Sequence, residues 1–106
     1  MSDPVYVIVQ MTITDPDGFR ADYAQPLAGQ LAEYGAIIHA VTPTPRVVEG
    51  SYDRNNTVIL EFPSAETFDD WYGSDAYAPL KAIRSKTSDP DRTTMLVLPT
   101  FAGLPS

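Results

Sequence analysis

The sequence predicts a single α+β domain in which four strands and two helices follow one another in the order β-α-β-β-α-β. Three observations predict this order. Four short segments are rich in β-branched and other apolar residues, two longer segments repeat apolar residues at helical steps, and glycine and proline punctuate the chain between them. The length of 106 residues is that of one domain, so we expect a single domain over residues 1–106.

The first strand is predicted over residues 5–14, VYVIVQMTIT. Because successive side chains of a strand point to opposite faces, one face of this strand would be purely apolar. The other face would be mixed, and it would carry Tyr6, Ile8, Gln10 and Thr12. Such a mixed surface is neither an ordinary core nor an ordinary solvent-exposed face.

The first helix is predicted to begin after Asp15, which can cap it, with Pro16 at its first position. Apolar residues then recur at steps of three and four through residues 19–34, which predicts an amphipathic helix. Pro26 lies inside this pattern, so we expect it to kink the helix or to remove one hydrogen bond. Gly35 is expected to end the helix in the left-handed conformation.

The second strand is predicted over residues 36–41. Two prolines follow it within residues 42–45 and cannot donate to a ladder, so we expect this strand at a sheet edge or broken by a bulge. A polar loop rich in turn-forming residues then leads to the third strand, which is predicted over residues 57–62. In that strand Glu61 belongs to the face opposite the core, and it shares this face with Ile59.

The second helix is predicted to start after Ser64 as its cap, to break at Gly73 and to restart near Pro79. The fourth strand is predicted over residues 93–98. The resulting fold class is ferredoxin-like: a four-stranded antiparallel sheet with two helices on one face. The mixed face would stay uncovered in one chain, so we expect two copies to pack sheet to sheet as a homodimer that encloses a cavity, a dimeric α+β barrel.

Composition excludes several classes of function. Fourteen acidic residues stand against seven basic ones, for a net charge of −7, so nucleic acid and anionic membrane surfaces are not expected partners. The absence of cysteine removes disulfides, thiolate nucleophiles and iron–sulfur clusters. The first residues show no basic region followed by an apolar run, so a cytoplasmic location is expected.

The sequence resembles the domain-of-unknown-function 1330 family over roughly residues 5–99. The resemblance rests on Tyr6-Val7, Asp15-Pro16, Tyr23, Tyr34-Gly35, Glu49-Gly50, the run from Ile59 to Ser64, Trp71-Tyr72, Tyr77 and the run from Pro79 to Arg84. It implies a dimeric α+β barrel. Proteins of that architecture include cofactor-free monooxygenases, muconolactone-type isomerases, haem-binding enzymes and stress-responsive proteins, so it implies no single reaction.

Two residues are candidates for catalysis. Glu61, on the predicted cavity face, could serve as a general base, or it could be a structural acid paired to an arginine or to the partner chain. His39 is the only histidine, and it could move protons near neutral pH or ligate haem iron. A lone histidine on an edge strand is also often simply packed or exposed. No metal-ligand cluster is evident in the sequence, so no metal is expected.

Three further residues are candidates for substrate binding. Tyr72 and Tyr77 carry hydroxyls that need a partner when buried, and one of them could reach the cavity mouth. Arg84 could bind a substrate carboxylate with both arms of its guanidinium, or it could form a salt bridge to Glu61 or Glu49. Trp71, by contrast, is expected to belong to the core.

The first hypothesis for function is therefore a small-molecule-binding homodimer with cofactor-independent activity of the isomerase or monooxygenase type. Glu61 would be its base, and His39, Tyr72, Tyr77 and Arg84 would position the substrate or stabilise an enolate. The alternatives are a non-catalytic ligand-binding or stress-related accessory protein, and a haem-binding protein with His39 as ligand. No cofactor is expected under the first hypothesis.

Overall fold

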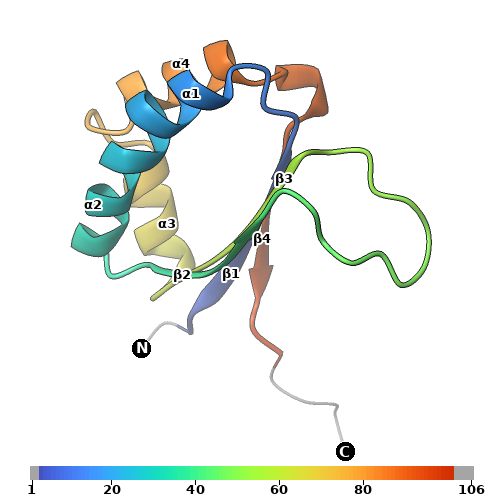
Figure 1. Ribbon diagram of the computed structural model, residues 1–106. Coiled ribbons are helices and arrows are strands. Elements are labelled where there is room, and N and C mark those ends of the chain that lie inside the picture. The colour runs from blue at the N-terminus through green and yellow to red at the C-terminus, as the bar shows by residue number, and fades with distance from the viewer. Residues whose placement is uncertain (1–2, 102–106) are drawn as a thin grey trace, which may run out of the picture.

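The computed structural model describes residues 3–101, and it has one antiparallel sheet covered by helices on one side (Figure 1). The sheet has the strand order β2-β3-β1-β4. Its strands are β1 (Val5–Met11), β2 (Ile37–Thr42), β3 (Asn56–Phe62) and β4 (Thr94–Pro99). The four strands lie close to where the sequence predicts them.

The helical layer is built from two stretches of chain. The first contains α1 (Pro16–Gly18), η1 (Phe19–Ala24) and α2 (Gln25–Glu33), and the second contains α3 (Ala65–Tyr72) and α4 (Ala78–Thr87). A short 3-10 turn, η2 (Pro90–Arg92), leads into β4. This is the predicted ferredoxin-like α+β fold. Among the described residues no helix is both long enough and apolar enough to cross a lipid bilayer.

The helix boundaries follow local chemistry. The Asp15 carboxylate accepts a hydrogen bond from the Gly18 amide at 3.1 Å, and the Ser64 hydroxyl accepts one from the Thr67 amide at 3.0 Å. Gly35 adopts a φ of 72°, the left-handed conformation that an end-of-helix glycine allows. These caps confirm the predicted helix starts and the predicted end.

Pro26 is accommodated without a break in the first helical stretch. The segment before it, η1, is π-helical, and the Gln25 amide reaches back to the Arg20 carbonyl. A wider turn just ahead of a proline absorbs the missing donor and the bulk of the ring. The expected local disturbance is therefore present as a π-helical turn.

β2 is the edge strand, as its trailing prolines predict, and it contains a bulge. Its register with β3 shifts between Ile38 and Ala40, so His39 is the extra residue. β1 is shorter than predicted: the sequence predicts it over residues 5–14, and it spans Val5–Met11. β1 ends at Met11 because the Asn55 side chain then takes over both backbone hydrogen bonds of Ile13, at 2.6 and 2.9 Å.

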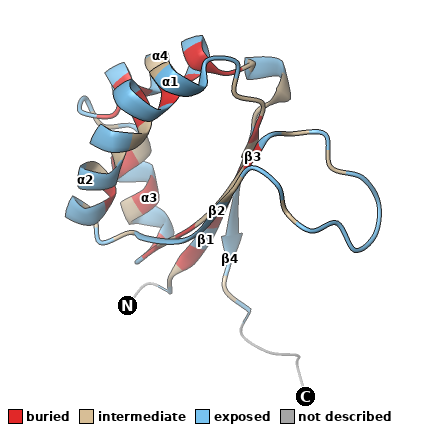
Figure 2. Ribbon diagram, viewed as in Figure 1, coloured by how far each residue is buried: buried red, intermediate tan, exposed pale blue. Residues whose placement is uncertain are grey.

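The hydrophobic core lies between the sheet and the helices, where Figure 2 shows the buried residues facing one another. The apolar row of β1 meets the apolar row of β3 in register, with Val5 opposite Phe62 and Val7 opposite Leu60. Phe68 and Trp71 from α3 pack on Phe62 at ring-centroid distances of 5.4 and 5.3 Å. The core therefore uses one face of each central strand and leaves the other face outside it.

Candidate functional site

The sheet surface opposite the helices is here termed the open face. It carries Tyr6, Ile8 and Gln10 from β1, Thr57, Ile59 and Glu61 from β3, Leu96 and Leu98 from β4, and Ile37 and His39 from β2. Tyr6, Ile37, Leu96 and Leu98 remain between 38% and 50% exposed. A contiguous surface of large apolar side chains this exposed is typical of an interface or a binding site.

One polar pair lies within this apolar surface. His39 Nε2 and Glu61 Oε1 are 2.8 Å apart. Glu61 is directly opposite Tyr6 on β1 and Ile37 on β2, so the strand register fixes its position. The bulge in β2 brings His39 to the same side, and bulges are common next to active sites because they re-aim a side chain.

The pair is suited to proton transfer. A carboxylate that is ionised can only accept a hydrogen bond, so in that state Glu61 would select the form of the imidazole that carries its proton on Nε2. Nδ1 is then the nitrogen that can accept a proton, and the carboxylate stabilises the imidazolium that results. The Tyr6 ring lies 6.0 Å from the His39 ring, centroid to centroid, and adds an aromatic wall beside the pair.

Tyr77 lies on the other side of the sheet, inside the helical layer. It is fully buried, its ring centroid is 4.2 Å from that of Trp71, and its hydroxyl is hydrogen-bonded to the Tyr23 hydroxyl at 2.8 Å. Burial raises the pKa of both Tyr23 and Tyr77 above the ordinary value, so both phenols stay protonated. The Tyr23–Tyr77 hydrogen bond thus links η1, in the first helical stretch, to the start of α4.

Tyr72 and Arg84 lie together at a second place in the helical layer. They line a polar cavity of about 220 Å³, together with Ser85, Ser88, Pro90, Thr93 and Met95. The Lys81 ammonium lies 4.3 Å from the centroid of the Tyr72 ring. Lys81, and to a smaller extent Arg84, lower the pKa of Tyr72 below its ordinary value.

The five predicted site residues therefore form two groups and not one. His39 and Glu61 meet on the open face, whereas Tyr72, Tyr77 and Arg84 belong to the helical layer on the opposite side. Glu61 is paired with His39 and not with Arg84. Sequence reasoning places Tyr6 on the same face as Glu61, but it misses the roles of Tyr23 and Lys81. The partner of Tyr23 is distant in sequence, and the contact of Lys81 with Tyr72 depends on how α3 and α4 pack.

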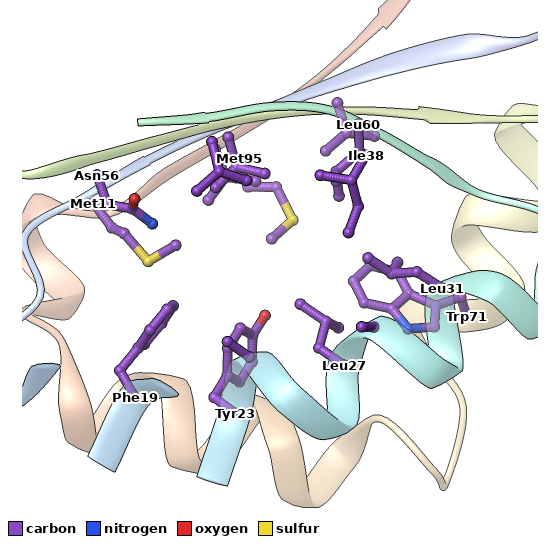
Figure 3. Close-up of a pocket in the computed structure, with 16 residues that line it drawn as sticks. Met11, Phe19, Tyr23, Leu27, Leu31, Ile38, Asn56, Leu60, Trp71 and Met95 are labelled. Atoms are coloured by element: carbon purple, nitrogen blue, oxygen red, sulfur yellow. The ribbon is translucent and has the colours of Figure 1, made fainter. Parts of the chain in front are cut away.

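A third hollow is an apolar cavity of about 120 Å³ between the sheet and the first helical stretch. Figure 3 shows Phe19, Tyr23 and Leu27 on its helical side and Met11, Asn56, Met95 and Leu60 toward the sheet. Ile38 on the edge strand also lines it and is half exposed. Nothing in the sequence pattern marks this cavity, since the apolar residues around it belong to the helix-facing rows of the strands and to the buried face of the helices. Within residues 3–101 no three metal-ligating side chains come together.

The comparisons with known proteins agree with this fold. The model of the family described as domain of unknown function (DUF1330) matches residues 4–99. Among curated proteins, none matches the chain significantly.

Solved structures resemble the chain at low sequence identity. A protein of unknown function from Rhodopseudomonas palustris has a TM-score of 0.79 and 12% identity, over 97% of this chain and 86% of that one. SnoaB, a cofactor-independent oxygenase from Streptomyces nogalater, has a TM-score of 0.68 and 15% identity, over 99% of this chain and 100% of that one. Rv0793 from Mycobacterium tuberculosis has a TM-score of 0.59 and 17% identity, over 95% and 98%. At these identities the likeness is one of fold.

Proposed function

This chain belongs to the family of the domain of unknown function DUF1330, and on that premise we propose that it is a homodimer that binds a small molecule between two open faces. In this proposal the His39–Glu61 pair moves a proton in a cofactor-independent reaction of the isomerase or monooxygenase type. The observation that carries the proposal is the 2.8 Å contact between His39 Nε2 and Glu61 Oε1 within an otherwise largely apolar surface.

The dimer is supported by the composition of the open face. Burial of its exposed apolar side chains would stabilise a dimer by about 25 cal/mol for each Å² of apolar surface removed from water. These side chains are those of Tyr6, Ile37, Leu96 and Leu98. Charged groups are few on this face, and the acid among them, Glu61, already has a partner. A second copy related by a two-fold axis presents the same surface, so one interface covers the open faces of both chains.

The chemistry follows from the pair. A carbon acid next to a carbonyl, or a phenol, would give its proton to His39 Nδ1. Glu61, which the sequence alone suggests as the base, would instead stabilise the imidazolium through its hydrogen bond to Nε2. In an isomerase, the enolate left behind takes the proton back from His39 at another carbon. In a monooxygenase, the phenolate itself would supply the electrons to dioxygen, so that one oxygen atom forms a bond to the ring carbon, the other leaves as water, and the phenol becomes a quinone. SnoaB, which shares the fold, is a cofactor-independent oxygenase, and this favours a reaction in which the protein supplies only acid–base chemistry.

Hydrogen–deuterium exchange tests this proposal without knowledge of the final product. The protein is incubated in D₂O with a panel of 1,3-dicarbonyl and hydroxyaromatic compounds, and loss of the substrate C–H signal is followed by NMR together with oxygen uptake. We expect at least one compound to exchange, and His39→Ala and Glu61→Gln each to slow that exchange by about 100- to 10,000-fold.

Glu33→Gln is the matched control, because Glu33 is an exposed acid at the end of α2 on the helical side. Its rate should equal that of the wild type. Full activity in both variants of the pair would overturn the catalytic assignment. Binding of a panel compound at the open face with no exchange and no oxygen uptake would instead support the non-catalytic ligand-binding or stress-related accessory role.

A further inference from the structure

Arg84 is a buried cation that pairs with no carboxylate of residues 3–101. Its residue is only 8% exposed, and its Nε lies buried without any hydrogen-bond partner. Among the ion pairs of residues 3–101, Arg20 pairs with Asp17, and Arg54 and Arg92 pair with Asp53, but none includes Arg84. This is notable in a chain with fourteen acidic residues and seven basic ones.

A buried charge that lacks a counter-charge is unfavourable, because the lost hydration is not replaced. Arginine does not relieve this by releasing its proton, since its side chain stays charged in proteins. The titratable neighbours of the guanidinium are phenols and not carboxylates. Burial raises the pKa of Tyr23 and Tyr77 and holds both protonated, whereas Tyr72 is hydrogen-bonded to the guanidinium and has a pKa lowered mainly by Lys81. Within residues 3–101 the guanidinium thus has no counter-charge, and a bound anion would stabilise it.

The cavity beside Arg84 has room for such an anion. Its volume is about 220 Å³, whereas one water occupies about 30 Å³ in the liquid. Two hydroxyls on its wall are already donated: that of Ser88 to the Arg84 carbonyl, and that of Thr93 to the Asp89 carbonyl. The donors left for a ligand are the guanidinium and the hydroxyls of Tyr72 and Ser85, while Met95 adds an apolar surface.

We propose that this cavity, the Arg84 pocket, binds a small organic carboxylate. The planar guanidinium matches a carboxylate with two parallel hydrogen bonds, and Tyr72 is placed on the same wall to donate to it. Pro90 and Met95 would contact the apolar body of the ligand.

Phosphate fits the pocket less well. Arg84 lies in the last turn of α4, where the helix carbonyls present partial negative charge, and this disfavours a dianion more than a monoanion. Phosphate sites also commonly use helix N-termini or several cations, whereas this pocket has one buried cation. A monoanionic carboxylate therefore matches the charge of the site.

The Arg84 pocket is independent of the reaction proposed for the open face. It lies on the helical side of the sheet, where Met95 from β4 lines both this pocket and the apolar cavity of Figure 3. A ligand there would not contact His39 or Glu61. The two assignments can therefore fail separately.

Titration with three defined probes tests the assignment: sodium benzoate, sodium acetate and inorganic phosphate, followed by amide chemical shifts and calorimetry. We expect benzoate to bind more tightly than acetate, phosphate to bind least, and the shifted amides to be those of Tyr72, Arg84, Ser88 and Thr93. Arg84→Met should weaken benzoate binding by about 10- to 100-fold, the loss expected for a charge-assisted hydrogen-bonded pair.

Arg20→Met is the matched control, because it removes an exposed arginine that already pairs with Asp17. Its benzoate affinity should equal that of the wild type. A melting curve guards against misfolding: Arg84→Met without ligand should keep or raise the Tm, since it removes an uncompensated charge, and benzoate should no longer raise it. No shift of the pocket amides with benzoate would overturn the assignment, as would phosphate binding as tightly as benzoate, or unchanged benzoate affinity in a folded Arg84→Met protein.

Discussion

The two faces of the sheet are made by the same strands but have different properties. On β1, Val7 is fully buried under the helices, while its neighbour Tyr6 is 39% exposed on the open face. The helix face is complete within one chain, because α3 and the first helical stretch supply its packing partners. The open face holds large apolar residues and the His39–Glu61 pair, and no layer formed by residues 3–101 covers it. The helix face therefore provides the stability of the single chain, and the open face is the surface at which we propose association and chemistry.

Trp71→Ala should give the largest effect on stability. Trp71 is 1% exposed and contacts Phe62, Phe68 and Tyr77 through its ring. Removing such a side chain costs about 3–5 kcal/mol of the free energy of unfolding. Urea unfolding followed by circular dichroism measures this loss, and the loss should be the same at every protein concentration because the contacts lie within one chain. A loss below about 1 kcal/mol would show that the helix face is not the main source of stability.

Tyr77→Phe should give a smaller loss. It removes the hydrogen bond between the Tyr77 and Tyr23 hydroxyls and leaves a buried hydroxyl without its partner, which costs about 1–3 kcal/mol. Tyr6→Phe on the open face is the comparison, since it deletes the same atom from a half-exposed ring and should cost much less. Equal losses in the two variants would contradict the contrast between the faces.

The same tyrosine pair predicts a pH dependence. Burial raises the pKa of Tyr23 and Tyr77, so the folded state favours the protonated phenols. Their contribution to stability is fully present below the ordinary tyrosine pKa of about 10 and is lost as the pH rises above it. Tyr72, whose pKa is lowered, acts in the opposite direction. When the pH is raised from neutral to above about 10, the free energy of unfolding should therefore fall less in Tyr77→Phe than in the wild type.

The sequence predicts the fold well because the signals for it are local. Strand alternation separates Val7 from Tyr6, and the caps at Asp15 and Ser64 and the left-handed glycine at position 35 need only neighbouring residues. The candidate site depends on long-range geometry. Tyr23 meets Tyr77 across 54 positions, and the bulge at His39 depends on how β2 pairs with β3.

The division of the predicted site residues illustrates the same limit. Glu61 and Arg84 both occur in the stretch that carries most of the family resemblance, yet Glu61 lies on the open face of a strand and Arg84 is a buried residue in the last turn of α4. Spacing along the chain does not say on which side of a sheet a helical residue will lie. The predicted placement of all five residues around one cavity required that information.

Sedimentation equilibrium of the wild type and of Leu96→Asp at micromolar concentration tests the central claim, that the open face is completed by a second copy. Leu96 is half exposed in the single chain, so the aspartate should leave the fold intact, as circular dichroism can check, while it puts an unpaired charge into the proposed interface. The wild type should sediment with twice the mass of one chain, and Leu96→Asp with the mass of one. A wild-type protein that is monomeric at micromolar concentration would contradict the claim.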